Sequence, residues 1–125
     1  MLINIYTAWI AFLLGCIAGA VSGMFFHKKN WMGGYDSWQR RLVRLAHISF
    51  FGIGFLNLAF ALTVKYLGLE TGIMVPAVLL VVGAATMPVV CYLSAWKPLF
   101  RHIFFIPAGS VILSLIFFLW RIFEL

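Results

Sequence analysis

The chain has 125 residues, of which 65% are hydrophobic and only 10% are charged, and its formal net charge is +6. A soluble domain carries about 25% charged residues, so the composition excludes an ordinary soluble domain. Four apolar segments, 3–26, 45–67, 73–95 and 103–122, each reach the roughly 20 residues that a helix needs to cross a bilayer. Because the connections between them are short, we predict one all-α membrane domain over residues 1–125, an antiparallel four-helix transmembrane bundle.

The first segment carries a small residue at every fourth position. No Lys or Arg precedes it, so we expect a retained span and not a secretory signal. Small residues at this spacing allow the backbones of two helices to approach closely in lipid. The helix that packs on this stripe can be another span of this chain or a span of another protein, and the sequence does not decide between the two. Its members are Ala11, Gly15, Gly19 and Gly23.

The connection after the first segment is long enough to have structure of its own. Asp36 stands where a helix N-cap is expected, and Gln39 follows three residues later, which is a variant of the capping box. This pattern predicts a short interfacial helix before the second span. Aromatic side chains that suit the headgroup layer flank it, and they are Trp31, Tyr35 and Trp38.

The second segment contains two candidate packing residues besides its apolar side chains. Gly54 belongs to a series of residues that recur every seven positions along one face of the segment. A glycine on such a face favours close contact with another helix. Asn57 is a polar side chain inside an apolar span, and a polar group in lipid requires a partner on another helix. We therefore predict an interhelical tie at Asn57, with an ion or substrate ligand as the alternative.

The third and fourth segments offer packing features and no reactive group. Pro88 removes one helical hydrogen bond, and Ser110 and Ser114 lie on one face of the fourth segment, where we expect them to pack. Cys16 and Cys91 both fall inside apolar segments, where free cysteines behave as small hydrophobic side chains. We expect neither a disulfide nor a metal site.

The basic residues are unevenly distributed among the connections. Cytoplasmic loops of membrane proteins carry an excess of Lys and Arg. The bias predicts an integral protein of a bacterial inner or equivalent membrane, with its first and third loops in the cytoplasm and both termini outside. It also excludes nucleic-acid binding as the role of the positive charge. Seven of the nine basic residues lie in or beside the first and third connections: Lys28, Lys29, Arg40, Arg41, Arg44, Lys97 and Arg101.

All three histidines fall near the predicted cytoplasmic boundary. His27 and His102 adjoin basic residues and are typical of the charged residues that flank a transmembrane span. His47 lies about one turn inside a span. An ionisable group inside a span is a functional candidate. Two imidazoles on facing helices can hold a haem iron axially. His47 and His102 are therefore the candidate ligands of a haem b, the one cofactor that the sequence suggests.

No Asp or Glu lies within a span, and no known catalytic motif occurs, so we predict no catalytic residues and no enzyme activity. We predict a structural or accessory subunit in the lipid bilayer. It would pack through the glycine stripe of the first segment against larger transmembrane proteins of an assembly, such as an energy-converting complex. One alternative is a small b-type cytochrome or a subunit that handles haem or quinone. A second alternative is a small channel or transporter that uses Asn57 and the serines of the fourth span.

Overall fold

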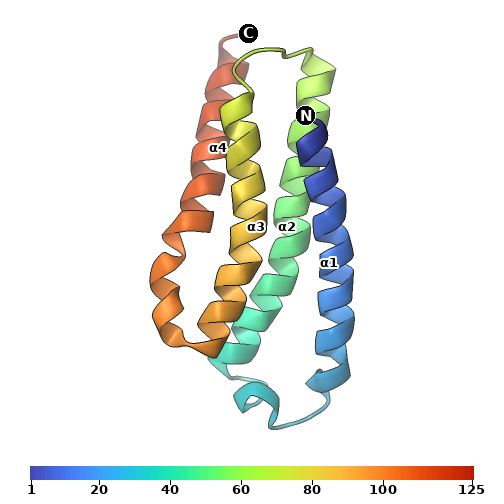
Figure 1. The fold of residues 1–125 in the computed structure, drawn as a ribbon, viewed down its shortest axis with the longest axis vertical. Helices are drawn as coiled ribbons and strands as arrows, with labels where there is room; N and C mark the ends of the chain where they lie inside the picture. Colours follow the sequence, from blue (N-terminus) through green and yellow to red (C-terminus); the bar gives the residue numbers. More distant parts are fainter.

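The computed structural model describes residues 1–125 and contains four long α-helices and no strand (Figure 1). The long helices are α1 (Leu2–Phe26), α2 (Trp38–Leu67), α3 (Met74–Trp96) and α4 (Phe105–Phe123). All four spans are long and apolar enough to cross a membrane, so the predicted four-helix fold is confirmed and the protein is an integral membrane protein. Two short 3-10 helices lie in the connections, and they are η1 (Trp31–Gly33) and η2 (Pro98–Ile103).

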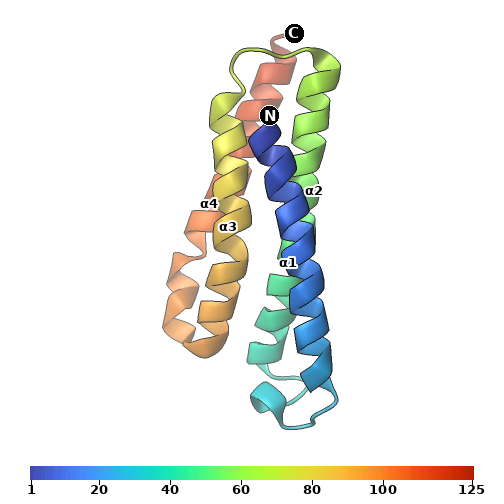
Figure 2. The ribbon, with the colours of Figure 1, turned by 45° about the vertical axis from the view of Figure 1, so that its right-hand side comes forward.

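Consecutive helices pack side by side in an antiparallel order. α1 packs against α2, α2 against α3, and α3 against α4, while α1 makes a smaller contact with α3. Both termini and the α2–α3 turn lie at one end of the molecule, and η1 and η2 lie at the other (Figures 1 and 2). The helices α1 and α4 are therefore the outer members of the bundle, and each keeps a broad face free of contacts within the chain.

The start of α2 differs from the sequence prediction by one residue. The N-cap is Ser37, whose hydroxyl oxygen accepts a hydrogen bond from the Arg40 backbone N–H at 3.2 Å and donates one to the Met32 carbonyl at 2.5 Å. The prediction of Asp36 as the cap was wrong, because Asp36 lies exposed in a turn and Ser37 is the extended residue that precedes the helix. The interfacial element before the second span consists of η1 and the first turns of α2, and α2 continues from there into the bilayer without a break.

The turn between α2 and α3 anchors the largest core of the protein. Gly68 adopts the left-handed conformation at φ 64°, and the backbone N–H of Leu69 bonds to the Val64 carbonyl at 3.0 Å. This Schellman-like closure satisfies the last carbonyls of α2 and turns Leu69 inward. Leu69 joins a buried apolar cluster at the end of the molecule that holds the termini. Its other members are Phe60, Val64, Ala77, Leu80 and Phe118.

Glycines mark the places where neighbouring helices approach most closely. A Cβ atom added at Gly15 would lie 2.7 Å from the Phe51 ring, and one at Gly19 would lie 2.5 Å from Nε2 of His47. On α2, a Cβ atom at Gly54 would lie 2.7 Å from the Phe12 ring and 3.3 Å from Cβ of the buried Ala11. The first part of the glycine stripe therefore lies against α2 of the same chain.

We predict that the α3–α4 contact is similarly intolerant of added volume at Gly83. A Cβ atom there would clash with Val111 and lie 3.2 Å from the Ser110 hydroxyl oxygen, whereas a Cβ atom at Gly109 would meet nothing within 4 Å. Overpacking of this kind costs about 1–3 kcal/mol, so Gly83→Ala is expected to lower the melting temperature in detergent. Gly109→Ala is the matched control and is expected to be neutral or slightly stabilising. Equal melting temperatures for the two variants would contradict the close contact.

Candidate functional site

Asn57 takes part in a buried polar network that joins three helices. Nδ2 of Asn4, near the start of α1, donates to Oδ1 of Asn57 at 2.8 Å and to the Ala77 carbonyl of α3 at 3.0 Å. Nδ2 of Asn57 donates to the Leu80 carbonyl of α3 at 3.2 Å and to the Ile53 carbonyl of its own helix at 2.9 Å. Both asparagines are fully buried. The donors and the acceptor of Asn57 are thus occupied within the protein, which leaves it little capacity for an ion or substrate.

The serines of α4 are also bonded within the chain. The Ser114 hydroxyl donates to the Pro76 carbonyl of α3 at 2.7 Å, and the Ser110 hydroxyl donates to the Pro107 carbonyl at 2.9 Å. The first of these bonds connects two helices, and the second lies within α4. Both serines are buried. The Ser114 hydroxyl therefore connects α4 to α3, and the Ser110 hydroxyl is bonded within its own helix.

His47 lies in the first third of α2 and faces α1. Its half-buried ring lies edge-on to Phe51, with 5.4 Å between the ring centroids, and its Nε2 approaches Gly19. The cavity beside it holds only about 100 Å³, which is well below the roughly 300–1,000 Å³ typical of cofactor pockets. The residues that line this cavity come from α1 and α2, and they are Gly19, Ser22, Phe26, Val43, Arg44 and His47.

His102 and His27 lie away from this cavity. His102 is exposed on η2, which packs on α3, and His27 is exposed directly after α1. The larger cavities are lined by neither His27 nor His102. No group of three or more His, Cys, Asp or Glu side chains is placed to hold a metal ion. The structure therefore does not bring His47 and His102 to one site, and haem binding stays a prediction.

Arg40 is the most unusual side chain at this end of the molecule, since it is charged and fully buried. It lies in the first turn of α2 and reaches back toward the end of α1. Its Nε donates to the Trp31 carbonyl at 2.7 Å, one terminal nitrogen donates to the Phe26 carbonyl at 3.3 Å, and the other donates to the Lys28 carbonyl. One guanidinium group thereby bonds to the last carbonyl of α1 and to two carbonyls of the α1–α2 connection.

Aromatic rings enclose the same guanidinium group. Its carbon atom lies 4.5 Å from the centroid of the Tyr35 ring, 5.4 Å from that of Trp31 and 5.5 Å from that of Phe26. Cation–π contacts of this kind become stronger when the cation is removed from water. Sequence reasoning treated Arg40 only as one of several cytoplasmic charges. The aromatic residues on either side of Gly33 and Gly34 were the signal that could have indicated its role.

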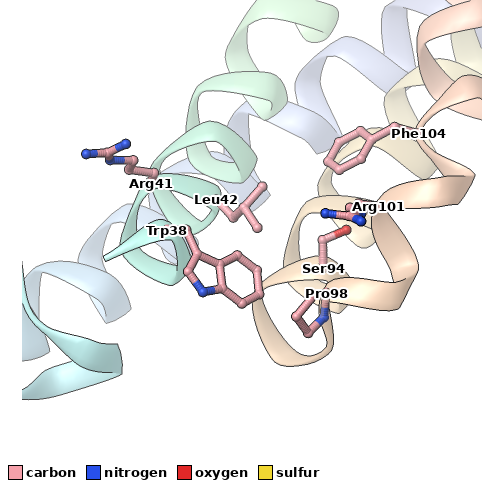
Figure 3. A pocket seen from close by; sticks show the side chains of 7 residues that line it. All are labelled: Trp38, Arg41, Leu42, Ser94, Pro98, Arg101 and Phe104. Carbon is pink, nitrogen blue, oxygen red and sulfur yellow. The ribbon is translucent and has the colours of Figure 1, made fainter. Parts of the chain in front are cut away.

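A second feature of this end is an open cavity of about 550 Å³ between α2 and the connection from α3 to α4 (Figure 3). We call it the α2–η2 pocket. Trp38 and Leu42 of α2 form one wall, and Ser94 and Arg101 lie on the opposite wall. Sequence analysis did not single out this pocket. Its lining residues are Trp38, Arg41, Leu42, Ser94, Pro98, Arg101 and Phe104.

The polar side chains of the α2–η2 pocket have no partners within the protein. The Ser94 side chain is fully buried and its hydroxyl oxygen makes no hydrogen bond. The structure contains one ion pair, Arg121 with Glu124 at the other end, so Arg41 and Arg101 face no carboxylate. The pocket thus offers cationic and hydroxyl groups beside an apolar wall, an arrangement suited to an anion that carries an apolar portion.

The fold and these sites define a four-helix integral membrane protein whose buried polar groups mostly bond to its own backbone. No known protein family, curated protein or solved structure matches this chain.

Proposed function

We propose that this protein is an accessory subunit that packs laterally against a larger membrane protein. The observation that carries the proposal is that the other helices of the chain leave most of the apolar surface of α1 uncovered. Only 11% of its most apolar stretch is buried within the chain, compared with 44% for α3. The intramembrane polar groups support the same role, because Asn4, Asn57 and Ser114 hold neighbouring helices together. The side-chain nitrogens of Asn4 and Asn57 and the Ser114 hydroxyl are all engaged in these bonds, which fix how the helices pack.

The face of α1 turned away from α2 offers a surface for a partner helix. Cys16, Ala20 and Gly23 are exposed there at helical spacing, and a Cβ atom at Gly23 would meet nothing within 4 Å. Small side chains in lipid allow another helix to approach closely, and van der Waals contact then drives the association. The proposed partner is a transmembrane helix of a larger protein, and Gly23 is the member of the predicted stripe that remains available to it.

The experiment compares native-gel migration after extraction in a mild detergent. The wild-type protein is expected to migrate within one larger assembly, and Gly23→Leu is expected to release a free species of about 14 kDa, the mass of the chain. Gly52→Leu is the matched control, because Gly52 of α2 is also exposed and has no neighbour within 4 Å of an added Cβ. A wild-type protein that migrates alone, or equal release by both variants, would contradict the proposal.

The same sample distinguishes the cytochrome alternative. A reducible Soret absorption band that His47→Ala abolishes would favour a haem protein with His47 as an axial ligand. A colourless preparation with an intact assembly would favour the accessory role. These two readings, migration and visible spectrum, come from one purification.

We further propose that the end bearing η1 and η2 faces the cytoplasm, in a bacterial inner or equivalent membrane. The support is that both strongly basic connections lie at this end, whereas both termini lie at the other (Figure 1). A fusion reporter that is active only in the cytoplasm is expected to be inactive at the C-terminus. Activity there would overturn the proposed orientation.

A further inference from the structure

We infer that the α2–η2 pocket binds the phosphate-bearing headgroup of an anionic glycerophospholipid from the adjacent membrane leaflet. This inference depends neither on the accessory role nor on which side of the membrane this end faces. It begins with the charge of the pocket. Arg41 of α2 lies at the rim and Arg101 of η2 lies on the facing wall, so two separate elements each contribute an arginine to the lining. No acidic side chain lines this cavity.

These two arginines differ from Arg40 in how their charge is balanced. Arg40 has backbone carbonyls and aromatic rings around it, whereas the side chains of Arg41 and Arg101 make neither a hydrogen bond nor an ion pair within the protein. Arg101 lies on the wall facing Trp38 and Leu42, and the guanidinium of Arg41 extends outward from the rim (Figure 3). Arg101 is therefore the principal anion ligand, and Arg41 attracts the headgroup from the rim.

Ser94 provides an independent observation at the same place. Its hydroxyl is buried without a partner, and an unsatisfied buried polar group costs about 1–3 kcal/mol. The residue lines the pocket on the wall that also carries Arg101 (Figure 3). A phosphate oxygen that accepts hydrogen bonds from the Arg101 guanidinium and the Ser94 hydroxyl would satisfy both groups. Charge-assisted bonds of this kind are the stronger class of protein hydrogen bond.

The remaining walls indicate a lipid in preference to a free anion. Trp38, Leu42 and Phe104 present apolar surface next to the cationic groups, and inorganic phosphate would leave that surface in water. A glycerol backbone and the first carbons of an acyl chain would cover it. The volume of about 550 Å³ lies within the range of small-ligand sites and accommodates a headgroup with its glycerol portion. The pocket also lies at a helix end rich in Trp and basic residues, which is where lipid headgroups lie.

The test is native mass spectrometry of the purified, delipidated protein after addition of phosphatidylglycerol. One lipid adduct is expected for the wild-type protein, with about tenfold weaker binding for Arg101→Gln and a smaller loss for Ser94→Ala. Lys29→Gln is the matched control, because it removes one exposed charge at the same end from outside the pocket. It is expected to bind like the wild type.

Two outcomes would overturn the inference. Equal losses for Lys29→Gln and Arg101→Gln would show attraction to the general surface charge and not a site. Competition by inorganic phosphate at the same concentration as the lipid would show a free-anion site that makes no use of the apolar wall. Melting temperatures of the lipid-free variants are measured in parallel. Unchanged melting of Arg101→Gln, whose side chain is exposed, would confirm that its weaker binding does not result from misfolding.

Discussion

Arg40→Ala is expected to open the α1–α2 connection while the four helices remain assembled. The variant removes the Arg40 donor from the carbonyls of Phe26, Lys28 and Trp31. The Lys28 and Trp31 carbonyls keep one backbone N–H donor each, from Trp31 and Gly34. The Phe26 carbonyl belongs to the last turn of α1, where the helix itself supplies no partner. Hydrogen bonds to a charged group contribute about 1.5–3 kcal/mol, so local opening of the connection should become on the order of tenfold or more frequent.

Limited trypsin digestion measures this opening, because Lys28 and Lys29 are exposed within the connection. Cleavage after these two lysines is expected to accelerate in Arg40→Ala. Arg41→Ala is the matched control, since it removes the same charge from the next residue, whose side chain makes no hydrogen bond or ion pair. Arg40→Lys should be intermediate, because an ammonium group cannot donate to three carbonyls with the fixed geometry of a guanidinium. Similar cleavage rates for Arg40→Ala and Arg41→Ala would refute the role of Arg40.

The helical architecture was predictable because span length and hydropathy alone determine it. Each apolar segment is long enough to cross a bilayer, and no loop is long enough to form another domain. The environment of Arg40 was not predictable in this way. Whether a guanidinium group reaches water or a set of carbonyls depends on the conformation of the preceding loop. No periodic pattern in the sequence indicates that conformation. The same limit explains why the cap was placed at Asp36 when Ser37 forms it.

The orientation of side chains around each helix was predictable only in part. Small residues at every fourth position rotate by about 40° per step around a helix of 3.6 residues per turn. Gly15 and Gly19 consequently lie against α2, whereas Gly23 has turned away from it. The histidines show the same limit. His47 and His102 are at the same end of the molecule, but His47 faces α1 and His102 is exposed on η2.

Asn57→Leu is expected to destabilise the bundle by about 2 kcal/mol, the middle of the range for leaving a buried polar group unpaired. The variant removes the bond from Asn4 and the bond to the Leu80 carbonyl, and it leaves the buried Asn4 amide with the Ala77 carbonyl alone. Leucine cannot compensate through burial, because lipid is as apolar as its side chain. Unfolding by sodium dodecyl sulfate in mixed micelles measures the change. Thr63→Val is the control, since the Thr63 hydroxyl bonds only within α2, to the Ala59 carbonyl.

A double-mutant cycle with Asn4→Leu separates the interhelical tie from the alternative of a ligand site at Asn57. If the two amides stabilise the fold through each other, the double variant loses less stability than the sum of the single variants. Additive losses would contradict the tie. A residue kept for an ion or substrate behaves differently, because groups held ready for a ligand commonly reduce the stability of the free protein. Asn57→Leu would then leave stability unchanged or raise it, so the sign of the measured change decides between the two roles.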